Sequence, residues 1–220
     1  MRRHLPAVVM TAVLLSLSAG VYAAETPPVD RMKIVLMTPE GKKTVLSGTK
    51  EDIWKYAEGF IDKGDYDYAR DSYLQMVEKD PGDIRSNILL GQLYQFKYSK
   101  NAEAVKYYKR AERLVPASNS KGKAFCQRLT AEVYRELAEK TNSLIYFVQA
   151  ISEYEKILDV DPDNIEVMYY LASCRLNGKD YPAAIQLFKR IIEQDPKGEW
   201  VAVSKKAISV AEQEQKARRS

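Results

Sequence analysis

The feature that most constrains this chain is a pattern of small, aromatic and proline residues that recurs about every 34 residues. The pattern is clearest from Ile165 to Pro196, where two short amphipathic segments flank the turn 177–180. Three other segments repeat this plan. One helix pair of this size cannot bury its own apolar face, so the repeated units must stack on their neighbours to form a core.

Small residues mark the places where paired helices can approach closely. They stand at Ala57, Gly91, Ala131 and Ala172 in the first helices and at Ala69, Ala104, Ala150 and Ala184 in the second helices. A proline closes each unit because the residue before it disfavours helical geometry. These prolines are Pro81, Pro116, Pro162 and Pro196. The spacing predicts repeats over about residues 50–83, 84–118, 119–164 and 165–198, and an amphipathic capping helix over 199–217.

The pattern resembles the tetratricopeptide repeat family. The signature residues of the last unit are Leu171, Ala172, Tyr181, Ala184, Phe188, Ile191 and Pro196. The resemblance implies an all-α fold, a right-handed superhelical array of helix-turn-helix units. It also implies a non-catalytic scaffold whose first helices line a concave groove for a protein or peptide partner.

Carrying the family's register onto this sequence gives a set of groove residues. They are Trp54, Glu58, Arg85, Gln92, Phe96, Arg128, Arg135 and Tyr169. The aromatic residues are candidate anchors and the arginines candidate orienting groups. The alternative is that Trp54, Phe96 and Tyr169 pack neighbouring first helices together. Some family members grip the carboxylate of chaperone tails with lysine and asparagine, but those positions here carry Trp54, Glu58, Leu89, Phe125 and Leu129, so that clamp is not expected.

The third repeat is longer than the others, because successive closing prolines are 35, 46 and 34 residues apart. About five extra residues are expected in a loop over 117–123, and about seven in the helices between Ala131 and Ala150. Repeat three is therefore expected to protrude from the array. In repeat two the turn between helices is one residue longer.

Residues 31–48 have a different character, with two β-prone runs on either side of the segment 38–42. This pattern predicts a β-hairpin before the helical domain, which spans 49–220 and begins at the capping box of Thr49 and Asp52. An isolated hairpin is marginally stable in water. It must pack on repeat one, pair with another strand, or order on binding, so a structural protein that self-associates through the hairpin is the second functional hypothesis.

The first residues are basic and are followed by an apolar run from Leu5 to Ala19 and by small residues at Val21 and Ala23. This is typical of a signal peptide over 1–23, with a proline-containing linker over 24–30. The alternative is an uncleaved membrane anchor. Cleavage leaves an exported protein without stable membrane insertion, which we expect in a bacterial periplasm, with secretion as the alternative.

Several kinds of chemistry are not expected. His4 is the single histidine and lies in the predicted leader, so no histidine-based catalytic or metal site, and no cofactor, is predicted. Ser118 and Lys121 match a short catalytic pattern that a lysine-rich loop produces by chance. Loss of Arg2 and Arg3 lowers the net charge from +4 to +2, which disfavours nucleic acid as a partner. A disulfide between Cys126 and Cys174 is permitted, but burial of both as small apolar residues is the preferred interpretation.

Overall fold

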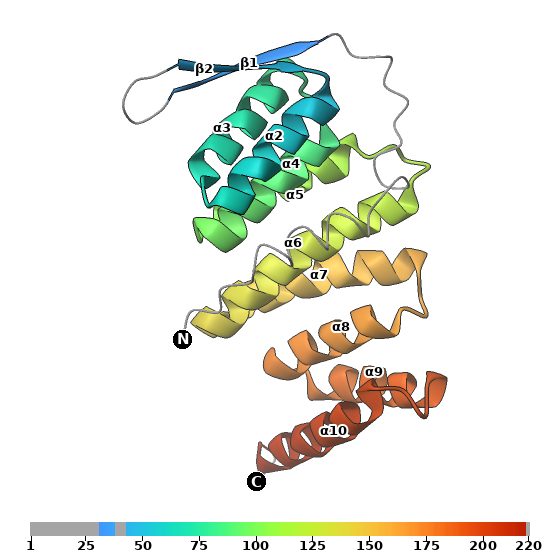
Figure 1. Ribbon diagram of the computed structural model, residues 1–220. Helices are drawn as coiled ribbons and strands as arrows, with labels where there is room; N and C mark the ends of the chain where they lie inside the picture. The colour runs from blue at the N-terminus through green and yellow to red at the C-terminus, as the bar shows by residue number, and fades with distance from the viewer. Residues whose placement is uncertain (1–30, 38–42, 219–220) are drawn as a thin grey trace. The chain divides into compact units, whose positions relative to one another are not determined.

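The computed structural model describes residues 31–37 and 43–218 (Figure 1). The predicted leader, the linker and the hairpin loop 38–42 lie outside these residues. The chain forms two compact units that divide between Cys126 and Gln127. We describe each unit by itself, as the N-terminal unit and the C-terminal unit.

The N-terminal unit contains the hairpin and the first two repeats. Its strands are β1 (Met32–Met37) and β2 (Lys43–Gly48). Its helices are α2 (Lys50–Lys63), α3 (Tyr66–Lys79), α4 (Ile84–Gln92) with the π-helical turn η1 (Leu93–Lys97), α5 (Asn101–Leu114) and the start of α6 (Ser120–Thr141). Helix α2 packs on α3, and α4 packs on α5 and on α3. This is the expected helix-turn-helix plan.

Helix α2 begins at the capping box predicted from the sequence. The Thr49 hydroxyl accepts a hydrogen bond from the Asp52 amide at 3.2 Å, and the Asp52 carboxylate accepts one from the Thr49 amide at 2.9 Å. Its inner face places Ile53, Ala57 and Ile61 in one core cluster with residues of α3 and α4. Full burial of a large aliphatic side chain such as Ile53 contributes about 1.5–3 kcal/mol, so this core stabilises the repeat far more than the cap does.

The hairpin packs on the first repeat, which is one of the three arrangements considered from the sequence. Strands β1 and β2 are antiparallel, with Val35 opposite Val45. Alternate residues of β1 are buried, and Ile34 belongs to the same core cluster as Ile53 of α2. The Gln75 side chain of α3 accepts a hydrogen bond from the Val35 amide at 2.8 Å and donates one to the Val35 carbonyl at 2.7 Å. Gln75 therefore bonds to β1 as a neighbouring strand would.

The C-terminal unit contains the rest of α6, then α7 (Leu144–Val160), α8 (Ile165–Asn177), α9 (Tyr181–Gln194) and α10 (Trp200–Ala217). Helix α10 packs on α9 and α8. It brings Trp200, Ala207 and Ile208 against the core cluster of repeat four, whereas Val203 is exposed. The last helix therefore covers apolar surface that repeat four would otherwise leave in water.

The surplus residues of repeat three lie in its helices. Helix α6 has 22 residues and α7 has 17, against 14 in each of α3, α5 and α9. The expected loop over 117–123 was wrong, because α6 already begins at Ser120. The Asn119 side chain accepts a hydrogen bond from the Gly122 amide at 2.8 Å and so begins the helix early. Whether the repeat protrudes stays a prediction.

Each repeat turns between its helices through one residue with left-handed backbone geometry. These residues are Gly64, Ser99, Asn142 and Lys179, with φ values of 83°, 53°, 50° and 69°. Each lies two residues before the second helix. In repeats one, three and four, the amide of the residue that follows donates a hydrogen bond to the carbonyl five residues earlier in the chain. In repeat two the acceptor is six residues earlier: the Lys100 amide donates to the Tyr94 carbonyl at 2.7 Å. The additional residue of repeat two is thus absorbed where η1 widens the helix, with the Tyr98 amide bonded to the Leu93 carbonyl.

Both cysteines are buried and unbridged, as preferred from the sequence. Burial raises the pKa of each thiol to about 12. Among the described helices, none is both long enough and apolar enough to cross a membrane.

Candidate partner-binding surfaces

Three of the predicted groove residues meet in one cluster between the first helices of the N-terminal unit. The Arg85 guanidinium of α4 lies over the Trp54 ring of α2, 4.4 Å from the ring centroid. It also donates to the carboxylates of Glu58 at 2.7 Å and Glu51 at 3.2 Å. The Trp54 indole donates to the Ser86 hydroxyl at 2.9 Å. The cluster therefore ties α2 to α4.

This cluster satisfies its own polar groups. Trp54 is half-buried and packs against the core of the first repeats. A partner that took up Arg85 or Glu58 would first have to replace their ion pairs with each other. The contacts of Trp54 therefore agree with the alternative interpretation, in which its ring packs neighbouring first helices together.

The remaining predicted residues of this unit have opposite environments. Gln92 is only 2% exposed, so its prediction as a groove contact is corrected: α4 is covered on all sides at this point. Phe96, on the π-helical turn that follows, is 40% exposed. Phe96 is therefore the predicted aromatic residue of this unit whose ring is available at the surface.

The predicted residues of the C-terminal unit also pair within the chain. Arg128 of α6 lies 3.7 Å from the Glu166 carboxylate of α8 and 4.0 Å from Glu132. Arg135 bonds to Glu139 at 2.9 Å and lies 5.2 Å from the Tyr170 ring centroid. Desolvation raises the pKa of Glu132, although Arg128 and Arg135 oppose this shift.

The Tyr169 ring packs against the last helix. Its centroid lies 4.3 Å from that of Trp200 and 6.0 Å from that of Phe188. The ring fills the space between α8, α9 and α10, and it is half-buried there. As with Trp54, packing accounts for its position.

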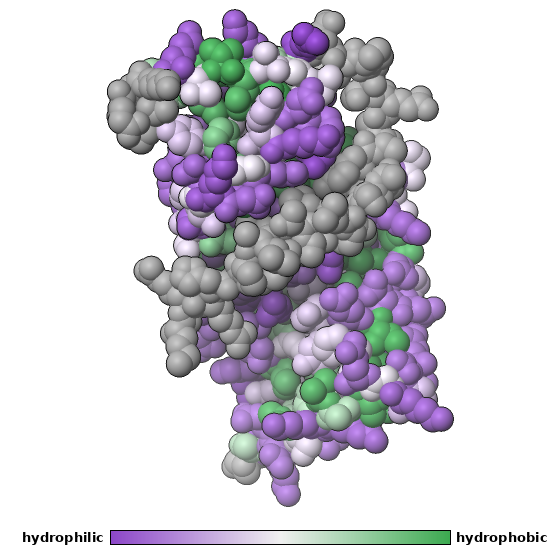
Figure 2. Space-filling view, in the orientation of Figure 1, coloured by the Kyte–Doolittle hydropathy of each residue, from purple (hydrophilic) through white to green (hydrophobic). Residues whose placement is uncertain are grey.

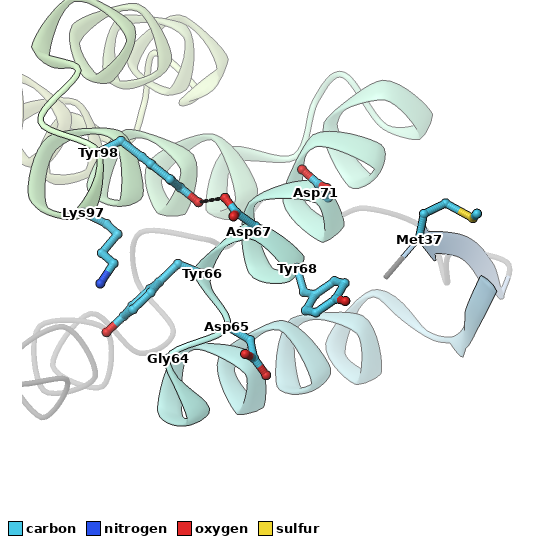
Figure 3. Close-up of a pocket in the computed structure, with 9 residues that line it drawn as sticks. All are labelled: Met37, Gly64, Asp65, Tyr66, Asp67, Tyr68, Asp71, Lys97 and Tyr98. Carbon is cyan, nitrogen blue, oxygen red and sulfur yellow. Dashed lines mark hydrogen bonds between the residues drawn. The ribbon is translucent and has the colours of Figure 1, made fainter. Parts of the chain in front are cut away.

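A cleft that the sequence did not predict lies in the N-terminal unit, at the turn between α2 and α3 (Figure 3). Its volume is about 470 Å³. Acidic and tyrosine side chains dominate its lining. The lining residues are Met37, Gly64, Asp65, Tyr66, Asp67, Tyr68, Asp71, Lys97 and Tyr98.

The polar groups of the cleft are arranged around two aromatic rings. The Tyr98 hydroxyl donates to the Asp67 carboxylate at 2.6 Å, as the dashed line in Figure 3 shows. The Lys97 ammonium lies over the Tyr66 ring, 3.7 Å from its centroid. Desolvation and the Asp67 hydrogen bond both raise the pKa of Tyr98, so its hydroxyl stays protonated at neutral pH. The cleft thus presents fixed carboxylates beside a ring that already holds an ammonium group.

Asp65 differs from the other two aspartates of the cleft. Asp67 and Asp71 are paired with Arg70, at 2.7 and 2.8 Å. Asp65 stands at the N-cap position of α3, but its side chain makes no capping hydrogen bond, and it forms no ion pair with another described residue. Part of this site was visible in the sequence, since acids and tyrosines alternate from Asp65 to Tyr68. Lys97 and Tyr98 come from the next repeat, and the π-helical turn that positions them gave no recognisable signal.

The described helix pairs, each joined by a turn that contains one residue with left-handed backbone geometry, define a helical-repeat protein of the α-solenoid class. Residues 147–206 match the family model described as Tetratricopeptide repeat. A solved structure of a tetratricopeptide repeat protein from Parabacteroides merdae is 22% identical, with a TM-score of 0.61 over 74% of this chain and 60% of that chain. A MamA crystal structure is 17% identical, with a TM-score of 0.56 over 74% of this chain and 86% of that one.

A MamA structure from Desulfovibrio magneticus is also similar, at 12% identity and a TM-score of 0.55 over 74% of this chain and 89% of that one. No curated protein matches the sequence. Residues 147–206 thus match the tetratricopeptide repeat family, and the chain shares the fold of solved tetratricopeptide repeat structures, as the pattern of small residues and prolines predicted. The all-α repeat fold with a short N-terminal hairpin is confirmed as well.

Proposed function

We propose that this protein is a non-catalytic scaffold of the cell envelope that binds a protein partner through its N-terminal unit. The repeat fold supports the scaffold role, because stacked helix pairs offer an extended surface for other proteins. The apolar run from Leu5 to Ala19 with its cleavable end supports export. The cleft in Figure 3 is the observation that supports the N-terminal unit as the surface that binds the partner.

The chemistry of the cleft suits a basic side chain of the partner. Carboxylates outnumber positive groups among its lining residues, so the cleft attracts a positive charge. Lysine and arginine groups bind carboxylates by charge-assisted hydrogen bonds and also stack on tyrosine rings. The Lys97 ammonium, which lies over the Tyr66 ring, already makes such a stacking contact inside the cleft. The Asp65 carboxylate forms no ion pair with another described residue, so it is available to bind a basic group of the partner.

The predicted groove enters this proposal through Phe96. Trp54, Arg85, Arg128, Arg135 and Tyr169 are engaged in contacts within the chain, whereas the Phe96 ring is exposed. An exposed aromatic ring can anchor a partner segment at little cost in conformational entropy. We therefore place the partner's contacts at the end of the first helix of repeat two and at the cleft.

The test is a selection of random peptides displayed on phage against the purified protein. We expect the selected peptides to share a lysine or arginine. Replacement Asp65→Lys should weaken their binding about tenfold or more, because a carboxylate is replaced by a like charge. It removes no helix cap, since Asp65 makes no capping bond.

The matched control is Asp62→Lys, which makes the same change of charge on exposed surface of α2, outside the cleft. Phe96→Ala tests the groove contact separately. Selected peptides without basic residues, or equal loss of binding in the two aspartate variants, would contradict the cleft as the binding site.

A further inference from the structure

The hairpin offers one open edge for strand pairing, and hydrogen bonds of the described residues identify which edge it is. In an antiparallel sheet, the amide and carbonyl of one residue point to the same side of its strand, and successive residues alternate sides. Both groups of Val35 bond to Gln75 of α3, so they point away from β2. The outer edge of β1 is thus closed at its centre.

The register then gives the orientation of β2. Val45 lies opposite Val35, so its amide and carbonyl also point away from the partner strand, and those of Lys43 and Ser47 do the same by alternation. No hydrogen bond joins these groups to any other described residue. The side chains of Lys43, Val45 and Ser47 are exposed, with Val45 at 43%. Strand β2 therefore presents an unpaired edge, the kind of surface that recruits another strand.

We propose that this edge pairs with β2 of a second copy of the chain, antiparallel and about a two-fold axis at Val45. The three outward-pointing residues are symmetric about Val45 in the sequence. Pairing them about this axis sets Lys43 opposite Ser47 of the second copy and Val45 opposite Val45. Each of the three pairs forms two hydrogen bonds. Other antiparallel registers that use the same edge leave at least one outward residue unpaired.

The side chains favour this register over others. On the outer face, Val35 and Val45 of one copy continue into Val45 and Val35 of the second, a row of β-branched residues across four strands. No lysine stands directly opposite another lysine. On the inner face, Leu46 meets Thr44 of the second copy, so no charged side chain interrupts this face at the junction. A partner of unrelated sequence has no such match to this edge.

The arrangement also closes on itself. Among the described residues, each copy contributes one edge that is open along its length, because Gln75 takes both backbone groups of Val35 at the centre of the outer edge of β1. An interface that uses the same surface in both copies is saturated at two. The result is a dimer with a four-stranded sheet. If each copy had two open edges, further copies could add to the sheet and form a growing fibre. The small interface predicts weak association, dependent on concentration.

The first experiment is cross-linking of the purified chain under mild oxidation. In Val45→Cys the two new thiols face each other across the axis, at a separation that a disulfide can span. In the control Ser47→Cys they lie on opposite sides of the axis, too far apart to bond. We expect the Val45→Cys dimer to form about tenfold faster or more on a non-reducing gel. The native cysteines are buried and should not react, so the unchanged chain serves as blank.

The second experiment is analytical ultracentrifugation of the unchanged chain, Val45→Pro and Val45→Thr. Proline lacks the outward amide but is tolerated in an edge strand, so the hairpin should persist. Threonine retains the amide. We expect mass to rise toward the dimer with concentration for the unchanged chain and Val45→Thr, but not for Val45→Pro.

A chain that remains monomeric at high concentration would overturn the proposal. Equal cross-linking of the two cysteine variants would show random collision, and a dimer that survives in Val45→Pro would place the interface elsewhere. Binding of an unrelated extended peptide to β2, without dimerisation, would replace the second copy as its occupant.

Discussion

Gly91 in α4 is the position where the close packing of paired helices can be tested most directly. A Cβ atom added to Gly91 would lie 2.3 Å from one ring carbon of Tyr108, 2.5 Å from a second and 2.9 Å from a third. Real side chains do not approach this closely, so either the ring or the helix must move. We therefore expect Gly91→Ala to destabilise the protein.

The magnitude follows from what the ring would lose. Tyr108 is completely buried, and its hydroxyl donates to the Gln95 side chain at 3.0 Å. Overpacking of a core costs about 1–3 kcal/mol, and loss of the hydrogen bond about 1 kcal/mol more. Alanine returns about 1 kcal/mol, because it favours a helix interior over glycine. The net expectation is a loss of roughly 1–3 kcal/mol, or about 2–4 °C in Tm for each kcal/mol.

Gly59 is the matched control, since it also lies inside a helix but a Cβ atom there would meet nothing within 4 Å. Gly59→Ala should therefore stabilise the protein by about 0.5–1 kcal/mol. Thermal and urea unfolding followed by circular dichroism would measure both variants. If Gly91→Ala is as stable as the unchanged chain, the reasoning from close packing is refuted.

Four further predictions concern other parts of the chain. Mass spectrometry of the exported protein should give an N-terminus at Ala24, and a full-length mass would indicate an uncleaved anchor. Burial raises the pKa of Asp83 above its ordinary 3.8, so the stability that protonated Asp83 contributes is present at low pH and is lost as the pH rises through the pKa of the folded state. The variant Asp83→Asn should not lose stability in this way. Unfolding curves of the variant and the unchanged chain should therefore differ at pH 7 and converge near pH 3. Alkylation of Cys126 and Cys174 should be at least about a thousandfold slower in the folded protein than in denaturant, since burial raises the thiol pKa from 9.0 to about 12, and comparable rates would contradict their burial. Trp54→Phe should cost about 1–2 kcal/mol through loss of the Ser86 hydrogen bond and part of the Arg85 contact, whereas an unchanged urea midpoint would show that the cluster does not tie α2 to α4.

The fold could be predicted because its determinants are local. Thr49 and Asp52 form a capping box within four residues of sequence, and the closing prolines stop each second helix. The small residues at Ala57 and Gly91 mark helix contacts whatever lies across from them. The prediction was wrong where one residue outweighed the pattern: Asn119 starts α6 at Ser120, four residues after the closing proline of repeat two.

The candidate site could be predicted only in part, because it depends on contacts between repeats. The sequence placed Trp54 and Arg85 on first helices, but not the guanidinium over the ring. It could not show that Gln92 is buried and Phe96 exposed, since η1 changes the helical register between them. The cleft unites Asp65 with Lys97 across 32 positions, which no local pattern indicates.

The link between Gln75 and Val35 also sets an order in time. Gln75 leaves the ribosome 40 residues after Val35, which takes about 2–8 s at usual rates of synthesis. A hairpin forms within microseconds, so during this interval β1 has its apolar face and its outer edge both uncovered. The strands are the first described elements to be made, yet they are completed only when α3 follows. Newly made chains are therefore most exposed to wrong strand pairing before the first repeat has closed.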